Sequence, residues 1–189
     1  MAPVLVAVGA QVFAGETLSP MAWLGVLVTS GGIFLLSGSI FLGKTPPLLV
    51  LTAMATGLII ASYSLVDGLG VRTAGTERGY IGWLFIAEIF VAGAVFLKRG
   101  RKAKRISRRT ILAGLLGGLV SAMAYALIIY AKSFSPLAAV STLRETSVVF
   151  AALIGMIWLR ERPWKLRLFA SGVVASGVVI MTLGNLSIT

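Results

Sequence analysis

Three charged residues lie inside long apolar stretches of this sequence, where a charge is costly to place. Glu88 is the one charged residue of Tyr80–Leu97, and Arg144 and Glu145 are the only charges of Leu137–Leu159. A guanidinium group in such surroundings attracts an anionic group, and a carboxyl group at low dielectric constant can take up a proton. These residues are therefore candidates for binding an anion, an amine or a proton. A structural Glu–Arg pair that locks two helices together is the alternative.

Other kinds of chemistry are excluded by residue types that the sequence lacks. It contains no Cys and no His, which excludes disulfides, thiolate or imidazole metal sites, Cys nucleophiles and Ser-His-Asp triads. A phosphate-binding loop and a nucleophile–base pair are absent from the sequence too. We therefore expect no enzyme, no catalytic residue, no metal site and no cofactor.

The composition of the 189-residue chain is that of an integral membrane protein. Hydrophobic residues make up 58% and charged residues 12%, against roughly 45–50% and about 25% in soluble domains. A net charge of +11 would suit nucleic acid if it formed a basic patch on a soluble surface. Here the charges lie between apolar runs, so we expect a lipid bilayer as partner and no nucleic acid.

The apolar runs predict an all-α membrane protein, a multi-pass helical bundle with six full transmembrane helices and a partial N-terminal one. A helix of about 20 residues crosses a hydrocarbon core of about 30 Å. The predicted full spans are Met21–Leu42, Leu48–Val66, Tyr80–Leu97, Ile111–Tyr130, Leu137–Leu159 and Leu168–Leu186, and the partial one is Ala2–Ala14.

The basic residues indicate how these spans are oriented, because Lys and Arg concentrate in cytoplasmic loops. The segment between Leu97 and Ile111 holds eight of them, and Arg160–Arg167 holds four. The alternate loops hold only Arg72, Arg78 and Lys132, and Gly15–Pro20 holds none. We therefore place the basic loops inside, and the Gly15–Pro20 loop and the C-terminus outside.

Depth in the predicted spans selects the candidate site residues. Glu88 and Arg144 each lie about 12 Å from the outer end of their helix, at 1.5 Å per residue, so a contact between them is feasible. Tyr63 and Tyr125 lie deep in their spans and are candidates for lining a cavity. Trp83 is a weaker candidate, because it lies near a predicted membrane interface, where aromatic belts form.

The two ends of the chain share a layout at an offset of 145 residues. Met1–Gly38 and Thr146–Leu183 each contain an apolar run, a loop glutamate (Glu16 or Glu161) and an apolar helix with a small-residue patch. The patches are Ser30-Gly31-Gly32 and Ala175-Ser176-Gly177. Five predicted spans separate the two loops and would put them on opposite sides of the membrane, as an inverted repeat requires. A GxxxG seam at Gly114–Gly118 is expected to pack within the chain, with a dimer contact as the alternative.

Two stretches resemble the EamA domain of the drug/metabolite transporter superfamily. Ser135–Thr146, continuing through the Glu161 loop to the Gly-rich last helix, resembles the closing part of that domain. Tyr63–Arg72 resembles the end of the first helix of the same repeat, and Glu16–Gly38 the end of the preceding repeat. The resemblance implies two inverted five-helix repeats around a central cavity. It also implies a permease or exporter of small metabolites, such as amino acids, in a bacterial cell (inner) membrane.

On this resemblance, residues 1–42 would be the C-terminal remnant of a first repeat and residues 43–189 a complete second repeat. Arg144 would bind an anionic group of the small-molecule substrate, and Glu88 or Glu145 would take up a coupling proton or a substrate amine. The chain would lack the opening helices of the first repeat. A non-transporting membrane subunit or an inactive fragment is therefore the alternative, with a homodimer or a partner chain supplying the missing helices.

Overall fold

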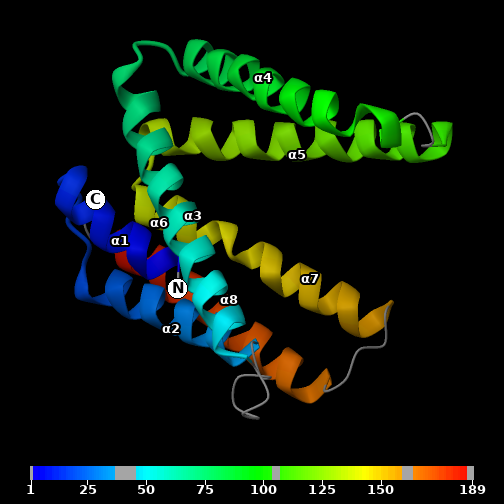
Figure 1. The fold of residues 1–189 in the computed structure, drawn as a ribbon. Coiled ribbons are helices and arrows are strands. Elements are labelled where there is room, and N and C mark those ends of the chain that lie inside the picture. Colours follow the sequence, from blue (N-terminus) through cyan, green and yellow to red (C-terminus); the bar gives the residue numbers. More distant parts are fainter. Residues whose placement is uncertain (1, 37–45, 104–106, 159–163, 187–189) are drawn as a thin grey trace. The chain divides into compact units, whose positions relative to one another are not determined.

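The computed structural model describes residues 2–36, 46–103, 107–158 and 164–186 (Figure 1). Over these ranges the regular elements are all α-helices and no strand forms, which confirms the predicted all-α class. The helices are α1 (Ala2–Phe13), α2 (Pro20–Leu36), α3 (Pro47–Thr73), α4 (Glu77–Ala103), α5 (Arg108–Phe134), α6 (Leu137–Arg144), α7 (Thr146–Ile157) and α8 (Trp164–Leu186).

Five apolar segments of the described chain are long enough to cross a membrane. They are α3, α4 as far as Lys98, α5, α6 with α7 taken together, and α8 as far as Asn185. These five coincide with five of the six predicted full spans. The sixth, Met21–Leu42, corresponds to the 17-residue α2 up to Leu36, and its last residues lie outside the described ranges. The count of six full spans therefore stays a prediction, while α1 coincides with the predicted partial span.

The chain divides into two compact units. Unit 1 combines Met1–Asp67 with Ser135–Thr189, and unit 2 is Gly68–Phe134. Unit 1 thus holds α1, α2, most of α3 and α6 to α8, whereas unit 2 holds the end of α3 with α4 and α5. Unit 1 is built by contacts between the two ends of the sequence. The division follows contacts in space, so the expected repeat boundary after residue 42 stays a prediction.

Unit 1 is centred on a close antiparallel contact between α2 and α8, which we call the α2–α8 seam. A Cβ placed on Gly32 would lie 2.7 Å from Val174 Cγ2 and 2.9 Å from the Val174 nitrogen. Contacts this close require glycine, and they let two helix backbones touch. Successive positions along α2 face earlier and earlier positions along α8. The facing pairs are Ala22 with Gly184, Gly25 with Met181, Thr29 with Gly177, and Gly32 with Val174.

The α2–α8 seam has an internal symmetry at the same offset of 145 residues. Two glycines, one on each helix, each meet two residues of the other helix. These contacts are Gly32 with Val174 and Ala170, and Gly177 with Thr29 and Gly25. Every residue of the first contact lies 145 positions from its counterpart in the second. The two helices therefore present equivalent surfaces to each other.

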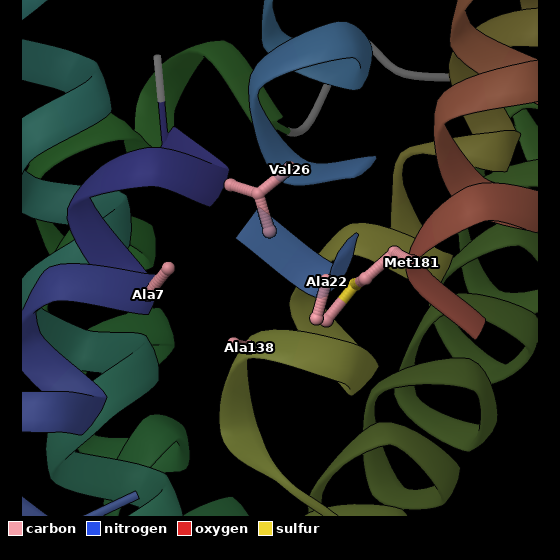
Figure 2. Packing of buried hydrophobic residues seen from close by; sticks show 5 residues of the cluster. All are labelled: Ala7, Ala22, Val26, Ala138 and Met181. Atoms are coloured by element: carbon pink, nitrogen blue, oxygen red, sulfur yellow. The ribbon is translucent and has the colours of Figure 1, made fainter. Parts of the chain in front are cut away.

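Small side chains fill the centre of unit 1. Figure 2 shows five buried residues that approach one another from four helices, namely Ala7 of α1, Ala22 and Val26 of α2, Ala138 of α6 and Met181 of α8. Large side chains on the same helices point outward, among them Leu24 and Leu27 of α2. In a bilayer the outer residues meet lipid tails, and small residues allow the close helix packing inside.

Unit 2 is a hairpin of α4 and α5 joined to the end of α3 (Figure 1). The turn between α3 and α4 uses Gly75 at φ +75°, a backbone conformation that favours glycine. Arg72 Nε donates a hydrogen bond to the carbonyl oxygen of Lys132 at 2.9 Å, which ties the end of α3 to α5. The contact of the Tyr80 ring with Gly70 closes the same end of the unit.

The predicted GxxxG seam of α5 makes no close contact with the other described residues of unit 2. No described atom lies within 4 Å of a Cβ placed on Gly114 or Gly118. The expectation that this seam packs within the chain therefore stays a prediction, and so does the alternative of a dimer contact. Sequence spacing identifies a stripe of small residues but does not say whether a second helix covers it.

Candidate functional site

The candidate site is an interruption in the middle of an apolar helix. The Leu137–Ile157 segment is long enough to cross a membrane, but α6 ends at Arg144 and α7 begins at Thr146. Glu145, between them, donates its backbone N–H to the Thr142 carbonyl at 3.1 Å, and Glu145 O accepts from Val148 N at 3.0 Å. Both bonds span three residues instead of four, as in a tighter turn. The predicted span Leu137–Leu159 is thus interrupted at its charged residues by one tighter turn, here called the α6–α7 break, in which Glu145 keeps helical dihedral angles (φ −67°, ψ −12°).

Two threonines bond to the backbone around this turn. Thr142 Oγ1 donates to the Ala138 carbonyl at 2.8 Å, and Thr146 Oγ1 donates to the Leu143 carbonyl at 2.7 Å. Hydroxyl groups that bond to the backbone of the preceding turn compete with the regular helix and bend it. In an apolar environment these bonds also satisfy carbonyl oxygens that would otherwise be costly to bury. Thr56 forms the same bond to Thr52 within the uninterrupted helix α3, so these bonds accompany the break without being sufficient to cause it.

The first half of the broken helix is buried and the second half is peripheral. Helix α6 packs against α1, α2 and α8, and both Ser141 and Thr142 are buried. Helix α7 contacts α8 and α6, and exposes large residues such as Phe150 and Ile157. Arg144 and Glu145, at the junction, are half-buried. The charged pair therefore lies where the chain passes from the packed centre of unit 1 to its outer surface.

A carboxylate from a distant loop fixes the start of α6. The Leu137 N–H donates to both carboxylate oxygens of Glu16, each at 2.9 Å. Pro136 precedes the helix and supplies no side-chain cap of its own, so Glu16 takes that role. A negative charge at a helix N-terminus is also favoured by the helix dipole.

The end of α1 places Glu16 at this point. Gly15 adopts φ +64°, and the Glu16 N–H donates to the Ala10 carbonyl at 3.2 Å, which is a helix-ending turn that favours glycine. The chain then enters α2 at Ser19, whose hydroxyl accepts from Ala22 N–H at 3.0 Å and donates to the Gly184 carbonyl at 2.9 Å. The loop between α1 and α2 therefore joins α6 and α8.

The other predicted site residues fall in both units. Tyr63 lies on α3 in unit 1 and is 37% exposed. Glu88 and Trp83 lie on α4, and Tyr125 on α5, all in unit 2. Glu88 is exposed, Trp83 is 74% exposed and Tyr125 is half-buried. Because Glu88 and Arg144 belong to different units, the expected contact between them stays a prediction.

Four residues of the site were not predicted from the sequence as parts of it. Thr142 and Thr146 lie inside the motif on which the resemblance is based, but nothing in the sequence distinguishes them from Thr56, which forms the same bond within an uninterrupted helix. Glu16 was noted only as a marker of the repeat, and Ser19 not at all. The roles of Glu16 and Ser19 depend on hydrogen bonds to residues 121 and 165 positions away in the sequence.

The arrangement can bind and orient charged groups. It offers a guanidinium and a carboxylate at adjacent positions of an irregular turn, next to hydroxyl groups. No group of three acidic residues suited to a metal ion is found among the residues described. The chemistry that these groups offer is ionic, with a guanidinium group for an anion and a carboxyl group for a cation or a proton.

The sequence model of the EamA-like transporter family matches residues 47–183, which is well over half of the chain. This chain belongs to the EamA-like transporter family. The matched segment runs from α3 into α8 and includes the break at Glu145. No curated protein and no solved structure gives a significant match.

Membership of the EamA-like family confirms the resemblance seen in the sequence. The chain is a multi-pass membrane protein and a membrane transporter of the drug/metabolite type. Transporters of the EamA family are generally not enzymes, which fits the expectation from the missing catalytic residue types.

Proposed function

We propose that this EamA-like chain carries small metabolites, such as amino acids or related compounds, along a path that passes the break between α6 and α7. Arg144 binds the anionic group of the substrate, and Glu145 or Glu88 binds a proton or the substrate amine. The observation that carries this proposal is the interruption of an apolar, membrane-length helix at Arg144 and Glu145.

Irregular backbone is tolerated at few places within a membrane. Within the hydrocarbon region, a break in a helix is stable when it is buried in protein or lines a water-filled cavity. Ionisable residues at such depth mark substrate and ion paths. Here the break and the ionisable residues coincide, and Arg144 and Glu145 are both half-buried. The coincidence favours a substrate site over a structural ion pair, because a structural pair needs no interruption of the helix.

We also propose that the two ends of the chain are parts of an inverted repeat. The antiparallel direction of α2 and α8 supports this, because counterpart helices of an inverted repeat run in opposite directions. The equivalent contacts of Gly32 and Gly177 at the 145-residue offset support it further. On this proposal the loops at Glu16 and Glu161 face opposite sides of a bacterial inner membrane, and the export direction follows the family resemblance.

Transport measured with purified protein in lipid vesicles tests the function. A panel of radiolabelled anionic, neutral and cationic amino acids is offered with and without a pH gradient. Arg144→Gln should lower the uptake of the transported acid about tenfold or more, since a hydrogen bond to a charged group contributes about 1.5–3 kcal/mol. Glu88→Gln and Glu145→Gln should reduce the response to the pH gradient.

Glu77→Gln is the matched control, because Glu77 is an exposed carboxylate in the first turn of α4. It should transport like the unaltered protein. Normal transport by the double variant Glu88→Gln with Arg144→Gln would contradict the proposed roles. If the unaltered chain transports no compound of the panel, the alternative of a non-transporting subunit is favoured instead.

A further inference from the structure

The α2–α8 seam contains a buried hydroxyl group that has no hydrogen-bond partner among the described residues. Thr29 of α2 is completely buried, and its Oγ1 lies directly against Gly177 of α8. A hydroxyl group that is buried without a hydrogen bond destabilises the state in which it is buried. The conformation in which α2 and α8 touch is therefore penalised by one of its own side chains.

Other threonines of the described helices avoid this penalty by a local bond. Thr56 of α3 and Thr182 of α8 donate to the carbonyl oxygen four residues earlier, at 2.8 and 2.9 Å. Such a bond to the preceding turn is open to a threonine within a helix. Thr29 forms no such bond to the Gly25 carbonyl, and its hydroxyl faces the α2–α8 seam instead.

The counterpart of Thr29 indicates that the packing of the seam does not require a hydroxyl group. At the offset of 145 residues this counterpart is Val174, which is also completely buried. It contacts Gly32, as Thr29 contacts Gly177. Valine and threonine have nearly the same shape and differ in that a methyl group replaces the hydroxyl. Valine at position 29 would therefore fill the same space without the penalty.

The other helix of the seam carries a second hydroxyl group of this kind. Ser171 of α8 is 3% exposed and has no hydrogen-bond partner in the described part of the chain. It follows Ala170, whose carbonyl oxygen faces Gly32 across the seam. Its counterpart at the 145-residue offset is Val26, again an apolar residue. Both helices thus bury a hydroxyl group at a position where the counterpart is valine.

We propose that the α2–α8 seam opens during the transport cycle and that the hydroxyl of Thr29 is hydrated when it opens. This hydroxyl gains hydrogen bonds to water once the helices separate, so Thr29 favours the open state over the closed one. Ser171 acts in the same direction. Thr29 is thus a positioning residue, which sets the balance between two arrangements of α2 and α8.

Opening of the seam would act on the α6–α7 break through α6. Helix α6 packs on both α2 and α8, and its Ala138 shares one buried cluster with Ala22 and Met181 of these helices. A change in the separation of α2 and α8 therefore moves the helix that ends at Arg144. The inference rests on the proposed carrier function, because it assigns the opening to the transport cycle.

The distance between α2 and α8 in lipid vesicles tests the opening without a transport assay. Because the chain has no Cys, spin labels can be attached at Leu27→Cys and Val179→Cys alone, whose native side chains are exposed. Pulsed electron paramagnetic resonance should give two distances, the longer one for the open seam. Thr29→Val should lower the ratio of open to closed protein about fivefold or more, since it removes the unpaired hydroxyl. Thr29→Ser keeps the hydroxyl and should keep the longer distance.

The matched control is Thr182→Val, which removes a hydroxyl that is already bonded within α8. It should leave the ratio of the two distances unchanged. In the transport assay, Thr29→Val should lower the maximal rate about fivefold or more at an unchanged KM, because it alters the opening and not the binding of substrate. Thr29→Ser should restore the rate, which a purely structural role of Thr29 would not explain.

The spin-label distances also distinguish failure of this inference from failure of the carrier function. A single distance in the unaltered protein, or the same ratio in the Thr29→Val and unaltered proteins, would overturn the inference. Two distances whose ratio responds to Thr29→Val but not to Thr182→Val would support the opening, even if no compound of the panel is transported.

Discussion

At the scale of single residues, one carboxylate holds the first half of the broken helix. Glu16 is the acceptor for the Leu137 N–H at 2.9 Å, while Pro136, at the N-cap position of α6, makes no side-chain cap hydrogen bond. Glu16→Ala should lower the free energy of unfolding by about 1–2 kcal/mol, since it removes a helix cap with a charged acceptor. Glu16→Gln should cost less, because its amide oxygen still accepts. Thermal unfolding in detergent measures both.

The control for this prediction is Glu77→Ala, which removes a carboxylate from an exposed helix start. If Glu16→Ala unfolds at the temperature of the unaltered protein, the bond to Leu137 contributes nothing to stability. Arg144 and Glu145 could be identified from the sequence, because charges inside an apolar run stand out. Glu16 could not be identified as a cap, since its bond depends on how α1 and α6 pack.

At the scale of elements, the close packing of α2 and α8 depends on glycines whose position on the helix face matters. A Cβ on Gly177 would lie 2.5 Å from the Thr29 nitrogen and 2.9 Å from the Gly25 carbonyl oxygen. Because both are backbone atoms, the helices must separate to admit it. Gly177→Ala should therefore reduce the free energy of unfolding by about 1–3 kcal/mol.

Gly172→Ala on the same helix is the matched comparison, because no described atom lies within 4 Å of a Cβ at that position. It should leave stability unchanged or raise it by about 0.5–1 kcal/mol, since Ala favours a helix over Gly. Thermal unfolding of the two variants side by side measures this difference. Equal unfolding temperatures for the Gly177→Ala and Gly172→Ala proteins would contradict the close approach of α2 and α8 at Gly177.

The helices themselves could be predicted from the sequence, whereas the contacts between them could be predicted only in part. A bilayer demands long apolar helices, so the hydropathy of each run located the starts of α3, α4, α5 and α8 to within four residues and their ends to within seven. The patches at Gly32 and Gly177 were noted, but composition did not distinguish Gly32, which touches Val174, from Gly31, which has no described neighbour. Helix faces are selected by tertiary contact, which a single sequence does not display.

At the scale of the whole molecule, the antiparallel α2–α8 seam and the offset of 145 residues both agree with the proposed inverted repeat. If α2 and α8 are counterparts, the loops that precede them lie on opposite sides of the bilayer, as the distribution of Lys and Arg also predicts. The break between α6 and α7 then lies beside this seam, since α6 packs on both α2 and α8. A path for substrate along α6 would thus run next to the contact between the two repeats.

Water access to the break tests the proposed substrate path most directly. The chain has no Cys, so single cysteines can be labelled without background. Thr146→Cys, at the half-buried start of α7 next to Glu145, should react with a water-soluble thiol reagent in lipid vesicles, and a transported metabolite should slow the reaction. Ile154→Cys, on the exposed face of α7, should stay unreactive in lipid. If the Thr146→Cys protein is as unreactive as the Ile154→Cys protein, no aqueous path reaches the break and the proposed carrier function is contradicted.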